Sequence, residues 1–316
     1  MRLIPDHYLQ IRDLILYNEK VKNPFKIVAL GDIHLSRLVD ERKLEPIKYQ
    51  LDQEQANYIV FLGDLIDMPK ELENPEKRQQ LLDLIKTSAG IAPTMVILGS
   101  HDYVEEEHYK NYDEYTVTFD KDFWNEVASI NNVYLLINDI YKDNQVLFMG
   151  YAQTLEYYYN NQNSHSEDLE AFYEDFSKHP ELYQNLPSDV VNIGLIHSPE
   201  YAKLAKNNEL LKDYDLLIGG HDHDGCIPFG IGNFRWGIIS PKKEILPKEV
   251  RGYRELETGT GLLISGGIVK IQNCAPRILH PLNHLCPMQM DTITYTSDEQ
   301  EIGMSRRLIY TKSNKR

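Results

Sequence analysis

The sequence has little of several features that would place a protein in a class at once. It contains only three cysteines in 316 residues, and because Cys226, Cys274 and Cys286 are odd in number and widely spaced, we expect no disulfide framework and a reducing compartment. No apolar run approaches the roughly 20 residues that a membrane helix needs. Residues 1–7 lack the basic region and the long apolar stretch of a secretion signal. These absences together predict a cytoplasmic protein without a transmembrane segment.

Positive charge is also scarce. The 33 Lys and Arg residues are outnumbered by 48 Asp and Glu residues, which gives a formal net charge of −15. Proteins that grip nucleic acid through its phosphates usually carry a basic face, and no block of Lys or Arg occurs here. Nucleic acid is therefore not an expected partner. If the substrate is a phosphate compound, the positive charge that faces it has to come from elsewhere, and bound metal is the obvious source.

What the sequence does contain is a repeated pattern, in which a short apolar run is followed at once by polar residues. The runs are residues 25–30, 58–62, 93–98, 190–196 and 214–218, and the segments 41–56, 75–88 and 200–212 between them favour helices. Strands that alternate with helices indicate an α/β fold whose polar turns gather at one edge of a sheet. Because no linker is evident, we count one domain over residues 1–316.

The remaining segments are less regular. We favour a strand within residues 1–24, a helix over 123–130, strands over 133–137 and 145–150 around an Asp/Asn turn, strands over 259–267 and 291–295, and a frayed basic tail after Arg306. Residues 104–122 and 152–188 are rich in acidic and tyrosine residues. The 152–188 segment favours a helical insertion, which is either a lid or cap beside a site or a solvated surface helix.

The turns after the five apolar runs all carry side chains that can bind metal. They are Asp32 with His34, Asp64, Ser100 with His101, His197, and His221 with His223. A pair of loop histidines such as His221 and His223 is a weak signal alone, and chance could supply one or two such turns. Five in series after five apolar runs indicate a metal site, and carboxylate with imidazole suits Mn, Fe or Zn.

Written out, the motifs are Gly31-Asp32-Ile33-His34, Gly63-Asp64-Leu65-Ile66-Asp67, Gly99-Ser100-His101-Asp102, His197 and Gly220-His221-Asp222-His223. This series resembles the signature of the calcineurin-like metallophosphoesterases, and residues 251–253 and 266–267 resemble the continuation of its bacterial branch. The resemblance implies an α/β (α+β) fold, a four-layer sandwich of two mixed β-sheets flanked by helices. It also implies a site at the strand ends along one edge.

The resemblance further implies two divalent metal ions, with Mn favoured and Fe or Zn as alternatives. The first ion would be held by Asp32, His34, Asp64 and His223, and Asp64 would bridge to a second ion held by Ser100, His197 and His221. Two ions about 3.5–4 Å apart can clamp a phosphate and lower the pKa of a bridging water, whose hydroxide attacks phosphorus in line with the leaving group.

Three further residues carry expectations from the same resemblance. His101 would face the leaving group as an acid or hydrogen-bond donor, and Asp67 would orient and charge it; the alternative for Asp67 is a helix cap. Ser100 stands where the family usually has Asn. Because a neutral hydroxyl is shorter and a poorer ligand, Ser100 either reaches the second ion or leaves that place to a water, and we expect the second ion to be held more weakly.

The function that we predict from the sequence is hydrolysis of a phosphodiester or phosphomonoester whose identity the residues do not indicate. Protein phosphatases of the superfamily continue the second motif as Asp-Arg-Gly, and Met68-Pro69 after Asp67 count against that activity. The acidic charge counts against a nuclease. A catalytically weak scaffold that kept the fold is favoured by Ser100 and opposed by the retention of the other motif residues. The sequence does not indicate an oligomeric state.

Overall fold

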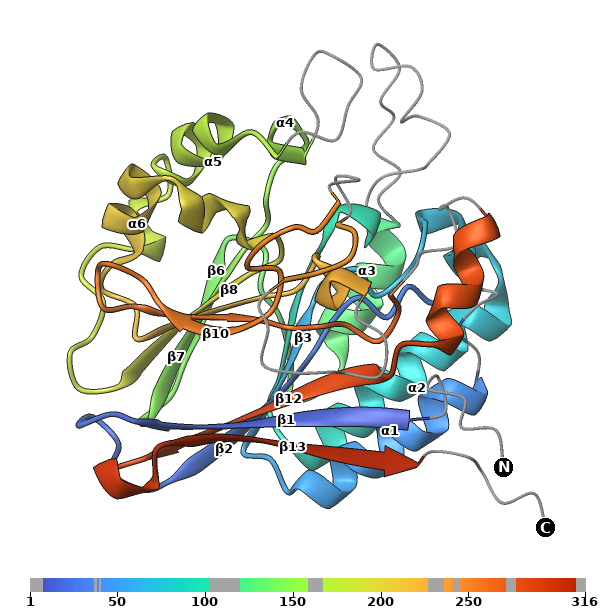
Figure 1. Ribbon diagram of the computed structural model, residues 1–316, viewed down its shortest axis with the longest axis horizontal. Coiled ribbons are helices and arrows are strands. Elements are labelled where there is room, and N and C mark those ends of the chain that lie inside the picture. Colours follow the sequence, from blue (N-terminus) through green and yellow to red (C-terminus); the bar gives the residue numbers. More distant parts are fainter. Residues whose placement is uncertain are drawn as a thin grey trace.

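Two β-sheets lie face to face in the computed structural model, with helices on their outer faces (Figure 1). The structure describes residues 8–36, 39, 41–102, 120–158, 167–226, 236–240, 245–270 and 277–310. Within this part of the chain the first sheet has the order β13-β1-β12-β2-β3-β4-β5 and the second has the order β10-β11-β9-β8-β7-β6. Both are mixed. In the first sheet β2 and β3 are parallel and β1 and β13 are antiparallel, and in the second sheet β7 and β8 are parallel and β6 and β7 are antiparallel. The fold class predicted from the sequence is confirmed.

The bounds of the elements follow the predicted runs closely. The strands are β1 (Tyr8–Tyr17), β2 (Phe25–Leu30), β3 (Tyr58–Leu62), β4 (Thr94–Ile97), β5 (Val133–Leu135), β6 (Asp139–Lys142), β7 (Val146–Tyr151), β8 (Val191–Ile196), β9 (Leu216–Gly219), β10 (Gly252–Glu255), β11 (Gly261–Ile264), β12 (Met288–Thr296) and β13 (Gly303–Tyr310). The α-helices are α1 (Glu41–Glu54), α2 (Pro75–Ile91), α3 (Lys121–Ser129), α4 (Leu155–Tyr158), α5 (Leu169–Phe176) and α6 (Ala205–Leu211). Short 3₁₀ turns lie at Pro69–Glu73, Ser100–Asp102, Pro180–Leu182, Pro199–Lys203, His223–Cys226, Arg277–His284 and Glu299–Glu301.

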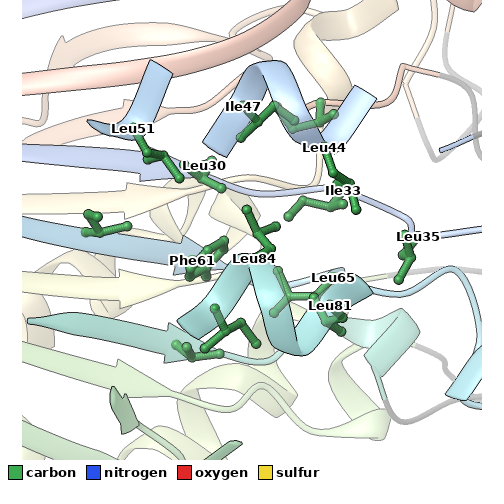
Figure 2. Close-up of a cluster of buried hydrophobic side chains, with 14 of the residues drawn as sticks. Leu30, Ile33, Leu35, Leu44, Ile47, Leu51, Phe61, Leu65, Leu81 and Leu84 are labelled. Carbon is green, nitrogen blue, oxygen red and sulfur yellow. The ribbon is translucent and has the colours of Figure 1, made fainter. Parts of the chain in front are cut away.

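Three apolar layers separate the four layers of secondary structure. Strand β2 is apolar from Ile27 to Leu30 because both of its faces are covered there. Ile27 and Ala29 face the second sheet, whereas Val28 and Leu30 face the helices. Figure 2 shows the outer layer of the first sheet, where side chains of α1 and α2 meet those of β2 and β3. A third layer packs α4, α5 and α6 against the second sheet. Strands buried on both faces read as continuous apolar runs, which is typical of parallel strands covered by helices.

The strands predicted over residues 133–137 and 145–150 are both present, but they lie in different sheets. Strand β5 is parallel to β4 at the edge of the first sheet, whereas β7 lies in the second sheet between β6 and β8. The strand that pairs with β7 across the Asp/Asn turn is β6, which the sequence analysis missed. Residues 139–142 are Asp-Ile-Tyr-Lys, an edge strand with no buried residue, so that they carry no apolar run.

Residues 307–310 were expected to be frayed surface, and this expectation is wrong. They belong to β13, an edge strand that pairs antiparallel with β1. Residues 311–316 lie outside the described part of the chain. The strand predicted within residues 1–24 is confirmed as β1, and the late strand at 291–295 is confirmed as part of β12. Among the helices that the structure describes, none combines the length and apolar character needed to cross a bilayer.

An ion-pair cluster ties β13 to the rest of the first sheet. The Arg307 guanidinium donates to both carboxylate oxygens of Asp13 on β1 and to both of Glu54 at the end of α1, with Nε–Oδ2 and Nη1–Oε1 distances of 2.9 and 2.8 Å. Burial raises the pKa of the Asp13 and Glu54 carboxyls, but the hydrogen bonds and charge of Arg307, with hydrogen bonds from Thr292 and Gln50, together outweigh it and leave each pKa below its ordinary value.

We predict that Arg307→Gln lowers the free energy of unfolding by about 1 kcal/mol at pH 7, the upper range for a partly exposed ion pair. Because both acids have a lowered pKa in the folded state, the stabilisation is present above their ordinary values of 3.8 and 4.5 and is lost as pH falls below them. Urea unfolding at pH 7 and pH 3 measures it. Lys86→Gln, which removes an exposed cation of α2, is the control; a difference that persisted unchanged at pH 3 would contradict the assignment.

Candidate metal centre

The turns that follow β2, β3, β4, β8 and β9 meet at one edge of the sandwich, because all five strands end on the same side. Their predicted site residues are buried, with at most 6% of any of them exposed. Five of these residues adopt a left-handed backbone conformation that side chains rarely take: Asp32 (φ 51°), His34 (46°), Asp64 (51°), His221 (67°) and His223 (49°). Backbone strain of this kind persists only where the surrounding structure enforces it, and it concentrates at functional sites.

One group of three side chains lies between the ends of β2 and β9. Asp32, His34 and His223 each offer a ligand atom, and these atoms lie within 4.8 Å of one another. The Nε2 atom of His223 is 3.9 Å from Oδ1 of Asp32, and the rings of His34 and His223 have centroids 5.0 Å apart. A carboxylate and two imidazoles at this spacing can bind one divalent transition-metal ion.

A second group is formed by Asp64, His197 and His221, whose ligand atoms also lie within 4.8 Å of one another. The Nε2 atom of His197 is 3.1 Å from Oδ2 of Asp64 and 3.2 Å from Nδ1 of His221. The same Oδ2 atom lies 3.6 Å from Nε2 of His34 in the first group. Asp64 therefore stands between the two groups, where one carboxylate can contact two ions.

The histidines have their ring orientation fixed by acceptors outside the groups. The Nδ1 atoms of His197, His223 and His101 lie 2.6, 2.6 and 2.7 Å from the backbone oxygens of Leu62, Val269 and Asp67. A carbonyl oxygen only accepts, so each Nδ1 carries the proton and donates it. The Nε2 atom is then the one that faces the groups, which is the arrangement of metal-binding histidines.

The donor set fits a cation. Within the described residues, the buried atoms Asp32 Oδ2, both ring nitrogens of His34 and Ser100 Oγ make no hydrogen bond. Such atoms are costly to bury unless another partner satisfies them. Burial lowers the pKa of His197, but the charges of Asp64 and Asp32 outweigh it and raise the pKa to about 10. This acidic surrounding demands a positive charge, which a proton or a metal ion can supply.

The pKa of Asp64 shows the matching effect of the histidines on the carboxylate. Burial raises the pKa of this carboxyl, but His197, His101 and His34 outweigh burial and hold it well below the ordinary value. Burial likewise lowers the pKa of His101, and the charges of Asp64 and Asp67 reverse the effect and raise it. Asp64 is therefore kept ionised at the centre of the site.

Asp67 was expected to orient His101, and the contact that the structure shows runs through the backbone: its carbonyl oxygen accepts from His101 Nδ1. The Asp67 carboxylate is buried, with Oδ1 3.4 Å from Nδ1 of His34. The alternative of a helix cap does not hold. The N-cap residue of the 3₁₀ turn that follows is Met68, and no side chain makes a capping hydrogen bond there. Asp67 is thus placed between both histidines.

Asp102 and Glu167 belong to the site although the sequence analysis gave neither a role. The Asp102 carboxylate accepts backbone N–H groups of Asp64, Leu65, Ile66 and Gly99 at 2.8, 2.9, 3.3 and 2.8 Å. It holds together the turns that follow β3 and β4. Its place in the third motif was the available signal. Glu167 has its Oε1 atom 2.6 Å from His221 Nε2, and no pattern in residues 152–188 pointed to it.

Several other polar groups singled out in the sequence are buried and have partners outside the two ligand groups. Asp224, expected as a turn former, has φ 57° and forms a buried ion pair with Arg251 at 3.1 Å. Arg251 lines a cavity of about 200 Å³ between β1, β10 and β13 that contains none of the site residues above. Burial raises the pKa of the Cys226 thiol to about 12, and the thiol donates to the Lys270 carbonyl, as expected for a small buried residue.

A family model adds the decisive observation. The model described as calcineurin-like phosphoesterase matches residues 25–225, which span both groups and all five turns. The chain belongs to the calcineurin-like phosphoesterase family. Membership, together with the Asp and His groups, supports a metal-dependent phosphoesterase, a hydrolase of phosphate esters.

Bacterial relatives in this phosphoesterase family are similar to the chain at low identity. An uncharacterized metallophosphoesterase of Aquifex aeolicus is 22% identical over 264 residues, which cover 83% of this chain and 85% of the relative. Counterparts of the same description from Campylobacter jejuni and Helicobacter pylori are 27% and 20% identical over 66% and 70% of this chain. The chain spans about half the length of those two relatives, 47% and 51%.

Solved structures of similar fold include a phosphopantetheinyl hydrolase from Mycobacterium tuberculosis, with 10% sequence identity and a TM-score of 0.43 over 77% of this chain and 89% of that one. A dimetal phosphatase from Danio rerio has 11% identity and a TM-score of 0.39 over 78% of this chain and 88% of that one.

The four N–H contacts of Asp102 generate a stability prediction. We expect Asp102→Asn to lower the free energy of unfolding by about 2–4 kcal/mol, because whichever way the amide is turned its NH₂ group faces buried N–H donors. Chemical unfolding of the metal-free protein measures the loss. Asp213→Asn, an exposed site, is the matched control. A loss no larger than that of the control would show that Asp102 does not anchor the turns.

Proposed function

We propose that the chain hydrolyses a phosphodiester or phosphomonoester with the help of two divalent ions, of which Mn²⁺ is favoured. The observation that carries the proposal is the place of Asp64, whose Oδ2 atom lies 3.1 Å from His197 and 3.6 Å from His34 in two separate ligand groups. Asp32, His34, Asp64 and His223 would hold one ion, and Asp64, Ser100, His197 and His221 would hold the other. When bound, such a pair binds the phosphate and activates the attacking water.

The remaining roles belong to side chains of this chain. His101 donates through Nδ1 to the Asp67 carbonyl at 2.7 Å, which fixes its ring. One of its ring nitrogens lies within 4.8 Å of ligand atoms of Asp64 and His34. Its raised pKa favours the protonated imidazole, which can give a proton to the departing oxygen. Asp67 positions His101 and His34 together.

A catalytically weak scaffold is the alternative from another class. Ser100 favours it, because a hydroxyl replaces the stronger amide ligand expected at that position. The buried Ser100 Oγ atom makes no hydrogen bond within the described residues. Ser100 directly precedes His101, whose backbone N–H donates to Asp64 Oδ1 at 2.9 Å, so its hydroxyl is available as a weak ligand. The complete set of carboxylates and histidines supports an enzyme over a scaffold. A nuclease is opposed by the net charge of −15.

The first test removes the shared carboxylate. With Mn²⁺ present, we expect the wild type to hydrolyse bis(p-nitrophenyl) phosphate or p-nitrophenyl phosphate, and Asp64→Asn to reduce turnover to the rate without enzyme. A neutral amide cannot neutralise two cations, so the variant also binds less Mn²⁺ by elemental analysis. Asp52→Asn on the exposed face of α1 should behave as wild type. Full turnover by Asp64→Asn would remove this residue from the reaction.

The second test addresses His101. We expect His101→Gln to slow hydrolysis of an alkyl phosphate ester by about 10²–10⁴-fold, the usual contribution of a positioned acid. The p-nitrophenyl ester should be slowed much less, because its leaving group departs without a proton. Mn²⁺ stoichiometry should stay unchanged. Equal slowing of both esters, or loss of one bound ion, would instead assign His101 to the ligands.

A further inference from the structure

Glu167 is a buried carboxylate at the metal centre that is contributed by the 152–188 segment. It directly precedes α5, and α4 and α5 lie next to each other on the outer side of the second sheet (Figure 1). Only 1% of its side chain is exposed, and its Oε1 atom lies 2.6 Å from Nε2 of His221. An ionised carboxylate is costly to bury unless it is paired. The partner that the geometry supplies is the imidazole of His221, in a close ion-pair contact.

The contact determines which nitrogen of His221 faces the second group. An ionised carboxylate oxygen at 2.6 Å repels a lone pair on the facing nitrogen, so this contact favours the proton of His221 on Nε2 and the lone pair on Nδ1. That Nδ1 atom is the one that lies 3.2 Å from Nε2 of His197. The other described site histidines with a fixed Nδ1 point Nε2 inward and donate to backbone carbonyls. His221 is turned the opposite way: its outward nitrogen is Nε2, and the group that lies against it is the Glu167 carboxylate rather than a backbone carbonyl.

Glu167 is itself held in place by a network that reaches the turn of His197. The Ser198 hydroxyl donates to Glu167 Oε1 at 3.3 Å and lies 2.8 Å from the Tyr157 hydroxyl. The Ser198 N–H donates to Gln153 Oε1 at 2.7 Å, and the Tyr158 hydroxyl donates to the same atom at 2.9 Å. The backbone of Glu167 is left-handed, with φ 45°. The carboxylate is therefore positioned by residues on both sides of the site.

We propose that Glu167 is a positioning residue for the second metal ion, acting through His221, and that the 152–188 segment is a structural part of the metal centre. The inference rests on the proposed two-ion function. A carboxylate that accepts from a ligating imidazole fixes the tautomer and makes the imidazole a stronger donor to the metal. The second ion is the one that has Ser100 in place of a stronger ligand. Glu167 thus strengthens the ligand set where that set is weakest.

The test is a titration of metal-free protein with Mn²⁺ by calorimetry, together with the electron paramagnetic resonance signal of an exchange-coupled Mn²⁺ pair. We expect two unequal affinities for the wild type. Glu167→Ala should weaken the second by about 10–100-fold, the usual effect of losing such a partner, and leave the first unchanged. The coupled signal should then need correspondingly more Mn²⁺. Glu174→Gln on the exposed side of α5 is the matched control.

Two further variants separate positioning from other roles. Glu167→Gln keeps an oxygen that can face Nε2 and is close in shape, but it loses the charge that strengthens the imidazole as a donor to the metal. It should therefore fold as wild type and weaken the second ion measurably, by less than about 10-fold. A loss as large as that of the alanine variant would overturn positioning and make Glu167 a ligand. In the His221→Ala background, Glu167→Ala should have no added effect on the second ion. An added effect would show that Glu167 does not act through His221.

Failure of the inference is distinguishable from failure of the proposed function. If the wild type, Glu167→Ala and Glu167→Gln each bind two ions, and the affinity for the second ion is the same in all three proteins, the role of Glu167 is overturned and the two-ion proposal stands. A wild type that binds no Mn²⁺ would instead overturn the two-ion proposal. If Glu167→Ala does not fold, Glu167→Gln decides alone, and an unchanged second affinity in that variant overturns the inference.

Discussion

The burial of the Asp64 carboxylate among histidines is the constraint on which the site depends. This side chain is fully buried, and its charge is kept by His197, His101 and His34 rather than by Lys or Arg. The adjoining backbone is shaped around it. Gly63 takes φ 87°, and a Cβ at Gly99 would collide with the Asp64 carboxylate. Both motifs therefore begin with glycine because the two turns approach each other too closely for a side chain.

The sequence was sufficient to predict those strands whose local apolar pattern is compatible with one structure only. Apolar runs such as 58–62 are buried on both faces and became central strands, and their polar ends met at one edge because parallel strands end on the same side. Edge strands β6 and β13 could not be predicted from apolar pattern. Asp139–Lys142 pairs with nearby β7 but carries no apolar run, whereas Gly303–Tyr310 is fixed by a neighbour far along the chain, as the contact of Arg307 with Asp13 shows.

The site shows the same division. The Asp and His side chains predicted as ligands come together in the groups described above, because each follows directly after the end of a strand. Which ring nitrogen faces inward could not be predicted, since acceptors such as Val269 and Leu62 are distant in sequence. The role of Glu167 could not be predicted for the same reason. It lies in a segment without hydrophobic periodicity, and only the fold brings it to His221. The role of Asp67 was foreseen as a carboxylate effect, whereas its contact with His101 uses the backbone carbonyl.

The order of strands in the first sheet bears on the order in which the protein can fold during synthesis. Strand β1 leaves the ribosome first, yet its two neighbours are β12 and β13, and Leu9 pairs with Met288 and Ile309. Closing so long a loop is entropically costly and slow. The nascent chain can assemble β2, β3 and β4 early. It cannot anchor His223 until Val269 has been made, so the metal centre is completed late, after most of both sheets.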